Sequence, residues 1–201
     1  MCGVVYDGGN AVFSPDGKSL ISPVGSRVSV FDLAKYFFQR KNQVSCFYYF
    51  IRETSFTLPF QMHKPVKYIC INPSGSLLFV VDESGRALLV SLHSHATLSF
   101  LKFSEIVTAP PRFSPDGLVL AVAVGRGLEI WRVPDFAAQD RLFAPWQLVK
   151  RIVQHQASIV NLNWSSDEIP CGNVKRGFIG RWISTASEDM TCRVFKLEYR
   201  K

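Results

Sequence analysis

Histidine and serine side chains are the groups through which this 201-residue chain could bind a metal ion or cleave a bond. His93 and His95 stand two positions apart, so a strand would present both imidazoles on one face, a spacing that can hold a metal ion. No further histidine, cysteine or carboxylate accompanies them. We therefore interpret the pair as part of a loop at the edge of a sheet.

The chain has the side chains of a hydrolase but no pattern that would assemble them. No Gly-x-Ser-x-Gly elbow occurs among its many serines and its four histidines, His63, His93, His95 and His155. Gly125-Arg-Gly127 is half of a phosphate-binding pattern, but it stands between two strands and indicates a hairpin turn. We predict that the protein is not an enzyme, with no catalytic residue, no cofactor, no metal and no small-molecule substrate.

Cysteine usage and hydropathy limit the cellular compartments in which we expect the protein. The five cysteines are scattered and include no Cys-x-x-Cys pair: Cys2, Cys46, Cys70, Cys171 and Cys192. This pattern is typical of neither a disulfide framework nor a zinc site, and it favours a reducing compartment such as the nucleus or cytosol. The longest uncharged apolar runs, such as Leu118–Val124, are far too short to span a membrane, and Met1–Asp7 lacks the basic region of a signal peptide. We expect no membrane association.

Basic side chains outnumber acidic ones, giving a formal net charge of +7. Two regions carry much of the excess: Lys35, Arg40, Lys41, Arg52, Lys64 and Lys67 in the first, and Lys175, Arg176, Arg181, Arg193, Lys196, Arg200 and Lys201 in the second. Such an excess attracts polyanions, nucleic acid above all. The alternative is a solvated surface that keeps the protein soluble.

Two aromatic segments lie within the first basic region. Tyr36–Phe38 and Cys46–Phe50 are interleaved with arginine and lysine, the composition of a platform on which single-stranded RNA stacks its bases. A protein interface rich in aromatic side chains and a loop tucked under a sheet are the alternatives.

The elements that must position these residues repeat along the chain. Phe13-Ser-Pro-Asp-Gly17 recurs as Phe113-Ser-Pro-Asp-Gly117, with weaker copies at Ile71-Asn-Pro-Ser-Gly75 and Trp164-Ser-Ser-Asp167. Proline, aspartate and glycine in this order suit a type I turn. Each turn precedes an apolar strand, within Ser19–Ser22, Leu77–Val81, Leu118–Val124 and Ile183–Ala186. We expect hairpins at Gly17 and Gly117, with Phe13 and Phe113 buried between sheets.

The spacing of these units predicts the fold. Phe13 to Phe31 and Phe113 to Trp131 are both separations of 18 residues, and Gly75 to Gly117 is 42. Three tight strands, a looser fourth and a restart after about 40 to 45 residues describe one WD-repeat blade. We predict an all-β, partial WD-repeat β-propeller over residues 1–201, with about four blades and a ring that this chain does not close. The blades span roughly 5–60, 61–105, 106–152 and 153–201.

Several stretches carry a more specific resemblance. They are Val5–Leu33, in which Ile21–Gly25 and Arg27–Asp32 are distinctive, followed in order by Asp82–Val90, Phe143–Trp146, Asn163–Asp167 and Ser187–Met190. In these residues the chain resembles the amino-terminal part of the periodic tryptophan protein two family of WD-repeat proteins. The resemblance implies a nucleolar scaffold of the small-subunit processome in ribosome biogenesis. It implies binding to other WD-repeat subunits and to pre-ribosomal RNA and snoRNA, directly or through those subunits. The alternative is a WD-repeat adaptor of another complex, such as a ubiquitin ligase receptor or a vesicle coat.

The chain departs from the WD-repeat pattern in two ways. No repeat ends in Trp-Asp, and the Gly-His pair that opens many repeats is reduced to Gln154-His155. In strong repeats such a histidine reaches the aspartate of the tight turn, here Asp189, and a tryptophan completes the hydrogen-bonded set. Phe195 has no indole N–H and cannot complete it. We expect an incomplete set in this blade.

Two units are longer than the others, at residues 44–52 and at 168–180. Removing about these residues restores units of normal span. They are either genuine loop insertions, which propellers tolerate at low entropic cost, or translated introns, and sequencing the transcript distinguishes the two.

Overall fold

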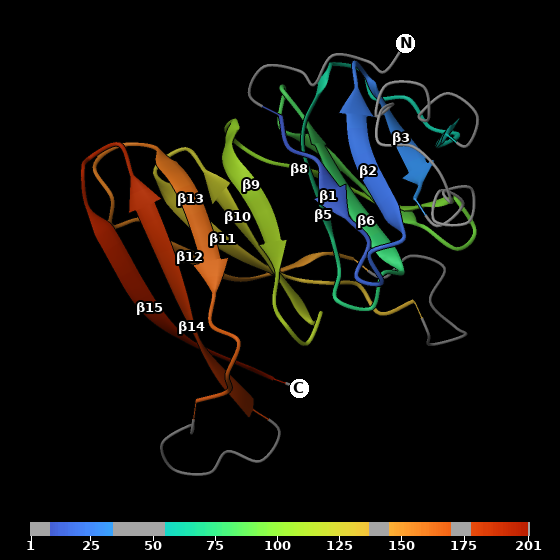
Figure 1. Ribbon diagram of the computed structural model, residues 1–201. Coiled ribbons are helices and arrows are strands. Elements are labelled where there is room, and N and C mark those ends of the chain that lie inside the picture. Colours follow the sequence, from blue (N-terminus) through green and yellow to red (C-terminus); the bar gives the residue numbers. More distant parts are fainter. Residues whose placement is uncertain (1–8, 34–54, 137–144, 170–177, 201) are drawn as a thin grey trace, which may run out of the picture. The chain divides into compact units, whose positions relative to one another are not determined.

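The computed structural model describes residues 9–33, 55–136, 145–169 and 178–200, and every regular element in these ranges is a β-strand (Figure 1). The chain divides into two compact units, Met1–Leu98 and Ser99–Lys201. Each unit contains two antiparallel sheets, each built from consecutive strands. Each sheet lies within one of the four ranges predicted for blades, whose exact bounds stay a prediction.

The first unit holds two four-stranded sheets. The first sheet contains β1 (Val12–Phe13), β2 (Ser19–Val24), β3 (Arg27–Asp32) and β4 (Ser55–Thr57) in that order. The second contains β5 (Val66–Ile71), β6 (Leu77–Asp82), β7 (Arg86–Ser91) and β8 (Thr97–Lys102), and the boundary between the units falls within β8. Their facing sides form one core: Ile21, Val28, Val30, Leu58, Met62, Val66, Ile69, Leu78, Val80, Leu88 and Val90.

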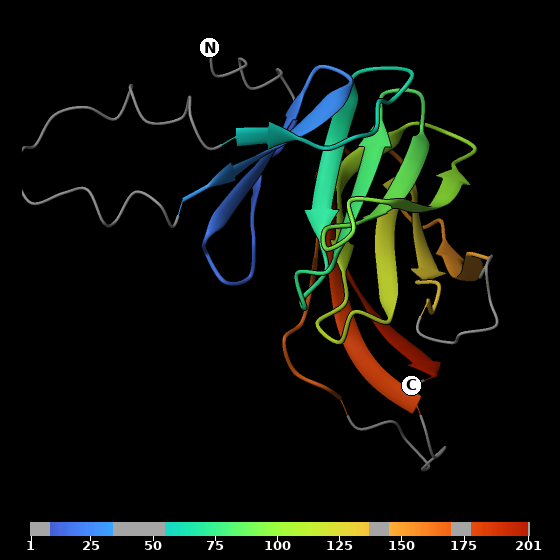
Figure 2. The same cartoon turned by 90° about the vertical axis from the view of Figure 1, so that its right-hand side faces the viewer.

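The second unit holds a four-stranded and a three-stranded sheet. The third sheet contains β9 (Val107–Phe113), β10 (Val119–Val124), β11 (Gly127–Arg132) and β12 (Gln147–Ile152). The fourth contains β13 (Ile159–Trp164), β14 (Phe178–Ser187) and β15 (Cys192–Arg200). The last two are the longest strands described and run side by side along the sheet (Figure 2).

A single core joins the third and fourth sheets. It consists of Ala109, Val119, Ala121, Ala123, Leu128, Ile130, Ile152, Ile159, Leu162, Ile179, Ile183, Leu197 and Tyr199. Side chains alternate between the faces of a strand, so one face of β10 supplies Val119, Ala121 and Ala123 to this core. All six residues of β10 are buried, so both faces of this strand are covered.

The predicted turns connect the first two strands of three sheets. In the third sheet, the Gly117 N–H donates to the Ser114 carbonyl at 2.8 Å, which closes the turn between β9 and β10. Gly117 has φ +75°, a left-handed conformation that glycine adopts without steric cost. Gly17 and Gly75 repeat this conformation between β1 and β2 and between β5 and β6. These hairpins are confirmed.

Burial of the two turn phenylalanines was predicted, and it is confirmed for only one. Phe113 is 8% exposed, whereas Phe13 is 63% exposed. Val12 pairs with Ile21, whose side chain lies in the core of the first unit, so Phe13 points to the opposite face. No described strand of that unit covers this face. The prediction for Phe13 is wrong because equivalent repeat positions have different neighbours.

The insertion predicted at residues 168–180 extends too far along the chain, because its last residues belong to a strand. Phe178, Ile179 and Gly180 belong to β14 and pair with β15, and Ile179 is 4% exposed within the core. These three residues are therefore an integral part of the sheet. Residues 170–177 and all of 44–52 lie outside the described residues, as do Tyr36–Phe38 and Cys46–Phe50.

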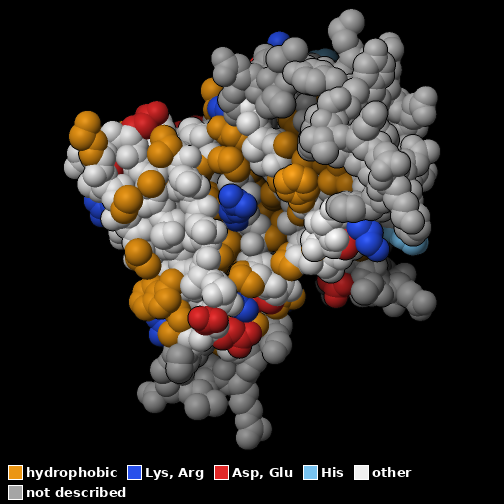
Figure 3. Space-filling model, in the orientation of Figure 1, with side chains coloured by type: hydrophobic (Ala, Val, Ile, Leu, Met, Phe, Trp, Pro, Cys, Tyr) orange, Lys and Arg blue, Asp and Glu red, His pale blue; other side chains and the backbone are white. Residues whose placement is uncertain are grey.

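Hydrophobic side chains are exposed on the fourth sheet (Figure 3). The face opposite the core carries Val160, Phe178, Trp182 and Val194, which are 40% to 62% exposed. Within the described part of the chain, no helix has the length and apolarity that crossing a membrane requires.

Candidate interaction groove

A carboxylate in the turn of the third sheet binds side chains of the fourth sheet. Asp116 Oδ1 accepts hydrogen bonds from Ser114 Oγ at 2.5 Å and from the Leu118 N–H at 2.9 Å. Its Oδ2 accepts from the Tyr199 hydroxyl at 2.7 Å and from Arg181 Nε at 3.4 Å. The turn is therefore stabilised by its own residues and by the neighbouring sheet.

Arg181 is buried and has three acceptors. Besides Asp116, it donates through Nη1 to the Ser166 carbonyl at 2.7 Å and through Nη2 to Glu168 Oε1 at 3.4 Å. A buried guanidinium is tolerated only when its N–H groups find acceptors, and these contacts provide them. Arg181 therefore holds the start of β14 against the third sheet.

The Asp116 network shifts two pKa values. Burial would raise the pKa of Asp116, but the hydrogen bonds from Ser114, Leu118 and Tyr199 and the charge of Arg181 lower it overall. Burial raises the pKa of the Tyr199 hydroxyl, and its hydrogen bond to Asp116 raises it further. At neutral pH the pair is a carboxylate accepting from a neutral phenol.

A second network crosses the fourth sheet, as the sequence predicts for His155 and Asp189. His155 Nδ1 lies 3.0 Å from Asp189 Oδ2, and His155 Nε2 lies 2.8 Å from Thr185 Oγ1. Thr191 Oγ1 donates to Asp189 Oδ1 at 2.5 Å. Because a carboxylate only accepts, Nδ1 carries a proton and donates it to Asp189. The hydrogen bond from Thr191 is the main reason that the pKa of Asp189 lies well below its usual range.

Asp189, His155 and Thr185 have the order of contacts found in a nucleophilic triad. Thr185 is 2% exposed and His155 is 4% exposed, so no substrate can reach the hydroxyl in this conformation. The contacts instead satisfy buried polar groups in the interior of a sheet. This geometry supports a structural role.

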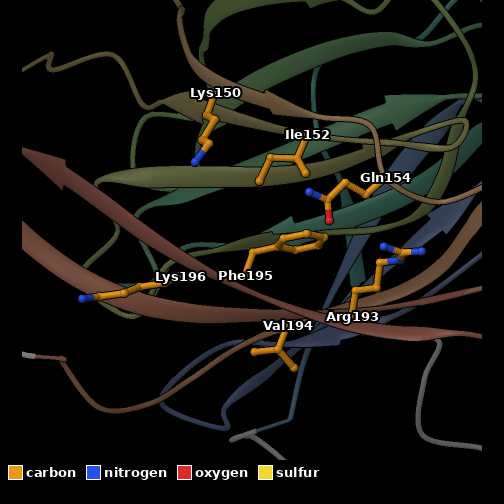
Figure 4. Close-up of a pocket in the computed structure, with 7 residues that line it drawn as sticks. All are labelled: Lys150, Ile152, Gln154, Arg193, Val194, Phe195 and Lys196. Carbon is orange, nitrogen blue, oxygen red and sulfur yellow. The ribbon is translucent and has the colours of Figure 1, made fainter.

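The second unit has a groove between β12 and β15, which we call the interblade groove. It has a volume of about 500 Å³ and is lined by Lys150, Ile152, Gln154, Arg193, Val194, Phe195 and Lys196. Figure 4 shows the Phe195 ring and the Arg193 guanidinium projecting toward β12, while Val194 points away. A smaller hollow of about 230 Å³ shares Lys150 and Lys196 and continues along β15 to Tyr199.

The interblade groove is positively charged. Its lining has three cations and no acidic side chain, and Lys196 pairs at 3.2 Å with Glu198, which lines the smaller hollow. Lys150 and Arg193 form no ion pair with any residue in the described ranges, and the buried Arg193 Nε has no hydrogen-bond partner there. Ile152 and Phe195 provide an apolar floor between these cations. The arrangement can bind an anion that has an apolar neighbour.

The structure also places the histidine pair and the glycine turn that the sequence suggests as possible sites. His93 and His95 lie between β7 and β8, and the His95 ring packs 5.1 Å from Phe56. The described ranges contain no group of three or more histidine, cysteine or acidic side chains that could hold a metal. Gly125 begins the tight turn between β10 and β11, where it has φ +55°.

The sequence interpretation missed the contacts of Arg181, Arg193 and Tyr199. Arg181 and Arg193 were counted only as part of a basic region. The alternation of Phe195, Leu197 and Tyr199 was the available signal, because every second residue of a strand shares a face. Which sheet that face would meet depends on tertiary packing.

Comparisons with known proteins give relatives by sequence and by fold. No family model matches the chain. Periodic tryptophan protein 2 of Saccharomyces cerevisiae is 37% identical over 198 residues, 98% of this chain and 18% of the relative. The homologue of Schizosaccharomyces pombe is 33% identical over 198 residues, 98% of this chain and 20% of the relative. The homologue of Mus musculus is 34% identical over 183 residues, 91% of this chain and 18% of the relative. The chain thus spans only 18% to 20% of these relatives.

A chain in the crystal structure of the mitotic checkpoint complex has a similar fold, with a TM-score of 0.64. The match covers 94% of this chain and 50% of that chain, at 16% sequence identity. That chain is a WD-repeat propeller, and at this identity the likeness concerns the fold alone. It confirms the predicted partial WD-repeat β-propeller.

Proposed function

The chain is a WD-repeat β-propeller segment similar to periodic tryptophan protein 2, and from this premise we propose that it is a non-catalytic scaffold in small-subunit ribosomal RNA processing. The observation that carries the proposal is a sequence similarity extending over 98% of the chain. A similarity of this extent includes strands, turns and loops, so it is more specific than the repeat pattern alone.

The proposed partners are other WD-repeat subunits of the small-subunit processome, in the nucleolus. Propellers bind through loops and grooves whose side chains vary while the sheets stay constant. The interblade groove is such a surface, and its lining residues are not part of the repeated turn pattern. We propose four blades at roughly residues 5–60, 61–105, 106–152 and 153–201.

We also propose contact with pre-ribosomal RNA and snoRNA, either direct or through the other subunits. The net charge of +7 supports this part of the proposal, because phosphate contacts are made by lysine and arginine. The exposed Lys150 and the partly exposed Lys196 contribute to this charge beside the interblade groove.

Purification from cells tests the proposal. The protein carrying the chain is tagged, isolated under mild conditions and probed for small nucleolar RNA and co-purifying subunits, with nucleolar staining in parallel. We expect snoRNA and other WD-repeat proteins to be enriched relative to a tag-only control. An adaptor of a ubiquitin ligase or vesicle coat predicts neither snoRNA nor nucleolar staining, so that result would reject the proposal.

A further inference from the structure

Three exposed cations lie at one end of the first unit. Arg27 begins β3 after its turn with β2, Lys64 lies just before β5, and Arg86 begins β7 after its turn with β6. None of them forms an ion pair with any residue in the described ranges. We call Arg27, Lys64 and Arg86 the cationic rim.

Backbone hydrogen bonds bring the three segments that carry the cationic rim together. The Val66 N–H, at the start of β5, donates to the Gly25 carbonyl in the turn between β2 and β3 at 2.8 Å. The Glu83 N–H, in the turn between β6 and β7, donates to the Pro65 carbonyl at 3.1 Å. Both sheets of this unit have four strands, and the cationic rim lies at their loop ends rather than along a strand edge. Its exposure therefore does not arise from an absent strand.

The Arg27 guanidinium is oriented but not neutralised. Its Nη2 donates to Gln61 Oε1 at 3.2 Å, and Gln61 Nε2 donates to Ser26 Oγ at 3.3 Å. The amide and the hydroxyl carry no charge, so they hold the side chain without offsetting its charge. Arginine has five N–H donors, and most of those on Arg27 are available to an anion.

Acidic side chains offset little of the charge at this end. Asp82 and Glu83 are the acidic residues in the three connecting segments. Asp82 is fully buried, and its Oδ1 accepts from the Ser84 and Arg86 N–H groups at 2.8 and 2.9 Å. Glu83 is partly exposed. Three exposed cations therefore face solvent beside one partly exposed carboxylate, and the charge presented to a ligand is positive.

The side chains around the cationic rim suit a phosphate backbone better than a protein surface. Protein interfaces depend on aromatic and apolar anchors that become buried. Among the described residues, the exposed large hydrophobic side chains all lie outside these three connecting segments. The exposed neighbours include Gln61 and Ser84, whose amide and hydroxyl groups are typical partners of phosphate and sugar. We propose that the cationic rim binds RNA directly, through the phosphate groups of its backbone.

The inference deepens the proposed function, on which it rests for RNA as the biological ligand. Binding of RNA by the cationic rim is measurable with the purified chain alone. If the purified chain failed to bind RNA, co-purification with snoRNA through other subunits would still stand. If co-purification failed, binding of RNA by the purified chain would be unaffected.

The experiment uses the whole 201-residue chain, attached sparsely to a sensor surface so that copies do not meet. The probes are a twelve-nucleotide oligouridine and a twelve-residue oligoglutamate, each titrated between about 50 and 200 mM salt. The variants are Arg27→Met, Lys64→Met, Arg86→Met and the three combined. Arg112→Met is the matched control, because Arg112 is exposed on β9 of the second unit and forms no ion pair within the described residues. Far-ultraviolet circular dichroism checks that each variant is folded.

We expect oligouridine to bind with an affinity that falls as salt rises. A contact with one phosphate of a single strand contributes about 0.7 to the slope of log K against log salt concentration. Each single variant should reduce this slope by about 0.7 and the combined variant by about 2. At about 50 mM salt, the affinity should fall about five- to ten-fold for each cation removed. Arg112→Met should bind like the unmodified chain.

Three results would each overturn the proposal. An unchanged slope in the combined variant would show that the cationic rim makes no phosphate contact. An equal loss in Arg112→Met would show that binding depends on charge spread over the whole surface. Oligoglutamate binding as tight as oligouridine binding, with the same response to the variants, would assign the cationic rim to an acidic protein.

Discussion

At the scale of single residues, the two copies of one motif have different energetic roles. Phe113→Ala should lower the free energy of unfolding by about 3 to 5 kcal/mol, since Phe113 is 8% exposed and truncation removes a buried ring. Phe13→Ala is the matched control and should cost less than about 1 kcal/mol, because its ring is 63% exposed. Urea unfolding at low protein concentration, followed by tryptophan fluorescence, measures both. Equal losses would mean that the environments of the two rings are misassigned.

The acid sensitivity of the second unit should depend on Asp116. The network lowers the folded-state pKa of this carboxyl, so its stabilisation is fully present above the unfolded pKa and is lost as pH falls through the folded value. We expect the urea midpoint to decrease between about pH 5 and about pH 3. The Asp116→Asn variant has no ionisable side chain at this position. Its urea midpoint should therefore change less over the same pH range. If the urea midpoint of this variant fell with pH as steeply as that of the unmodified chain, Asp116 would not be the cause of the acid sensitivity.

Residue-scale prediction from the sequence succeeds where the cause is local. The turn at Gly117 follows from the backbone preferences of proline, aspartate and glycine, and the His155–Asp189 contact follows from a known repeat pattern. The predicted burial of Phe13 is wrong because the exposure of its ring depends on the neighbouring sheet, which the motif does not encode. The Arg193 donor was missed for the same reason, since β12 and β15 meet only in the fold.

At the scale of elements, the fourth sheet shows where an insertion ends and a strand begins. Replacing residues 170–177 by a four-residue Gly-Ser link should change stability little, because closure entropy varies slowly with loop length. Replacing 170–180 by the same link should cost several kcal/mol, since Ile179 leaves the core and three pairs with β15 are lost. Hydrogen exchange of the β15 amides measures the difference. Equal protection in both variants would show that Phe178–Gly180 is dispensable.

Strand positions were predicted well because alternating apolar residues and turn motifs mark them. β6 and β10 begin within one residue of their predicted starts. The lengths of β14 and β15 were not predicted, since Phe178–Gly180 lies within the predicted insertion at 168–180, and its place in the sheet follows from its pairing with β15.

At the scale of the whole molecule, exposed sheet faces should govern solution behaviour. Repeat architectures depend on interfaces between successive units, and the outer face of the fourth sheet carries Val160, Trp182 and Val194 in exposed positions. We expect the isolated chain to self-associate in sedimentation experiments. Val160→Lys with Trp182→Lys should reduce this association, whereas Met190→Lys, in a turn and 98% exposed, should not. A monodisperse monomer with a sharp cooperative melt would contradict the prediction.

The net charge gives a further prediction at this scale. If the excess of +7 contacts RNA, the logarithm of the binding constant should fall linearly with the logarithm of salt concentration, with little dependence on RNA sequence. Filter binding of two unrelated oligonucleotides between about 50 and 200 mM salt measures the slope. An affinity that does not change with salt would exclude phosphate contacts as the main source of binding.

The Asp116 network also has a consequence for the order of events during synthesis. Ser114 and Leu118 can hold Asp116 as soon as the turn leaves the ribosome, but Tyr199 follows 83 residues later. At roughly 5 to 20 residues per second, Tyr199 appears about 4 to 17 s after Asp116. During this interval the third sheet has its own turn but not the fourth sheet that covers its core. A nascent chain stalled before Arg181 should therefore expose that core to chaperones, and one stalled well beyond Tyr199 should have buried it.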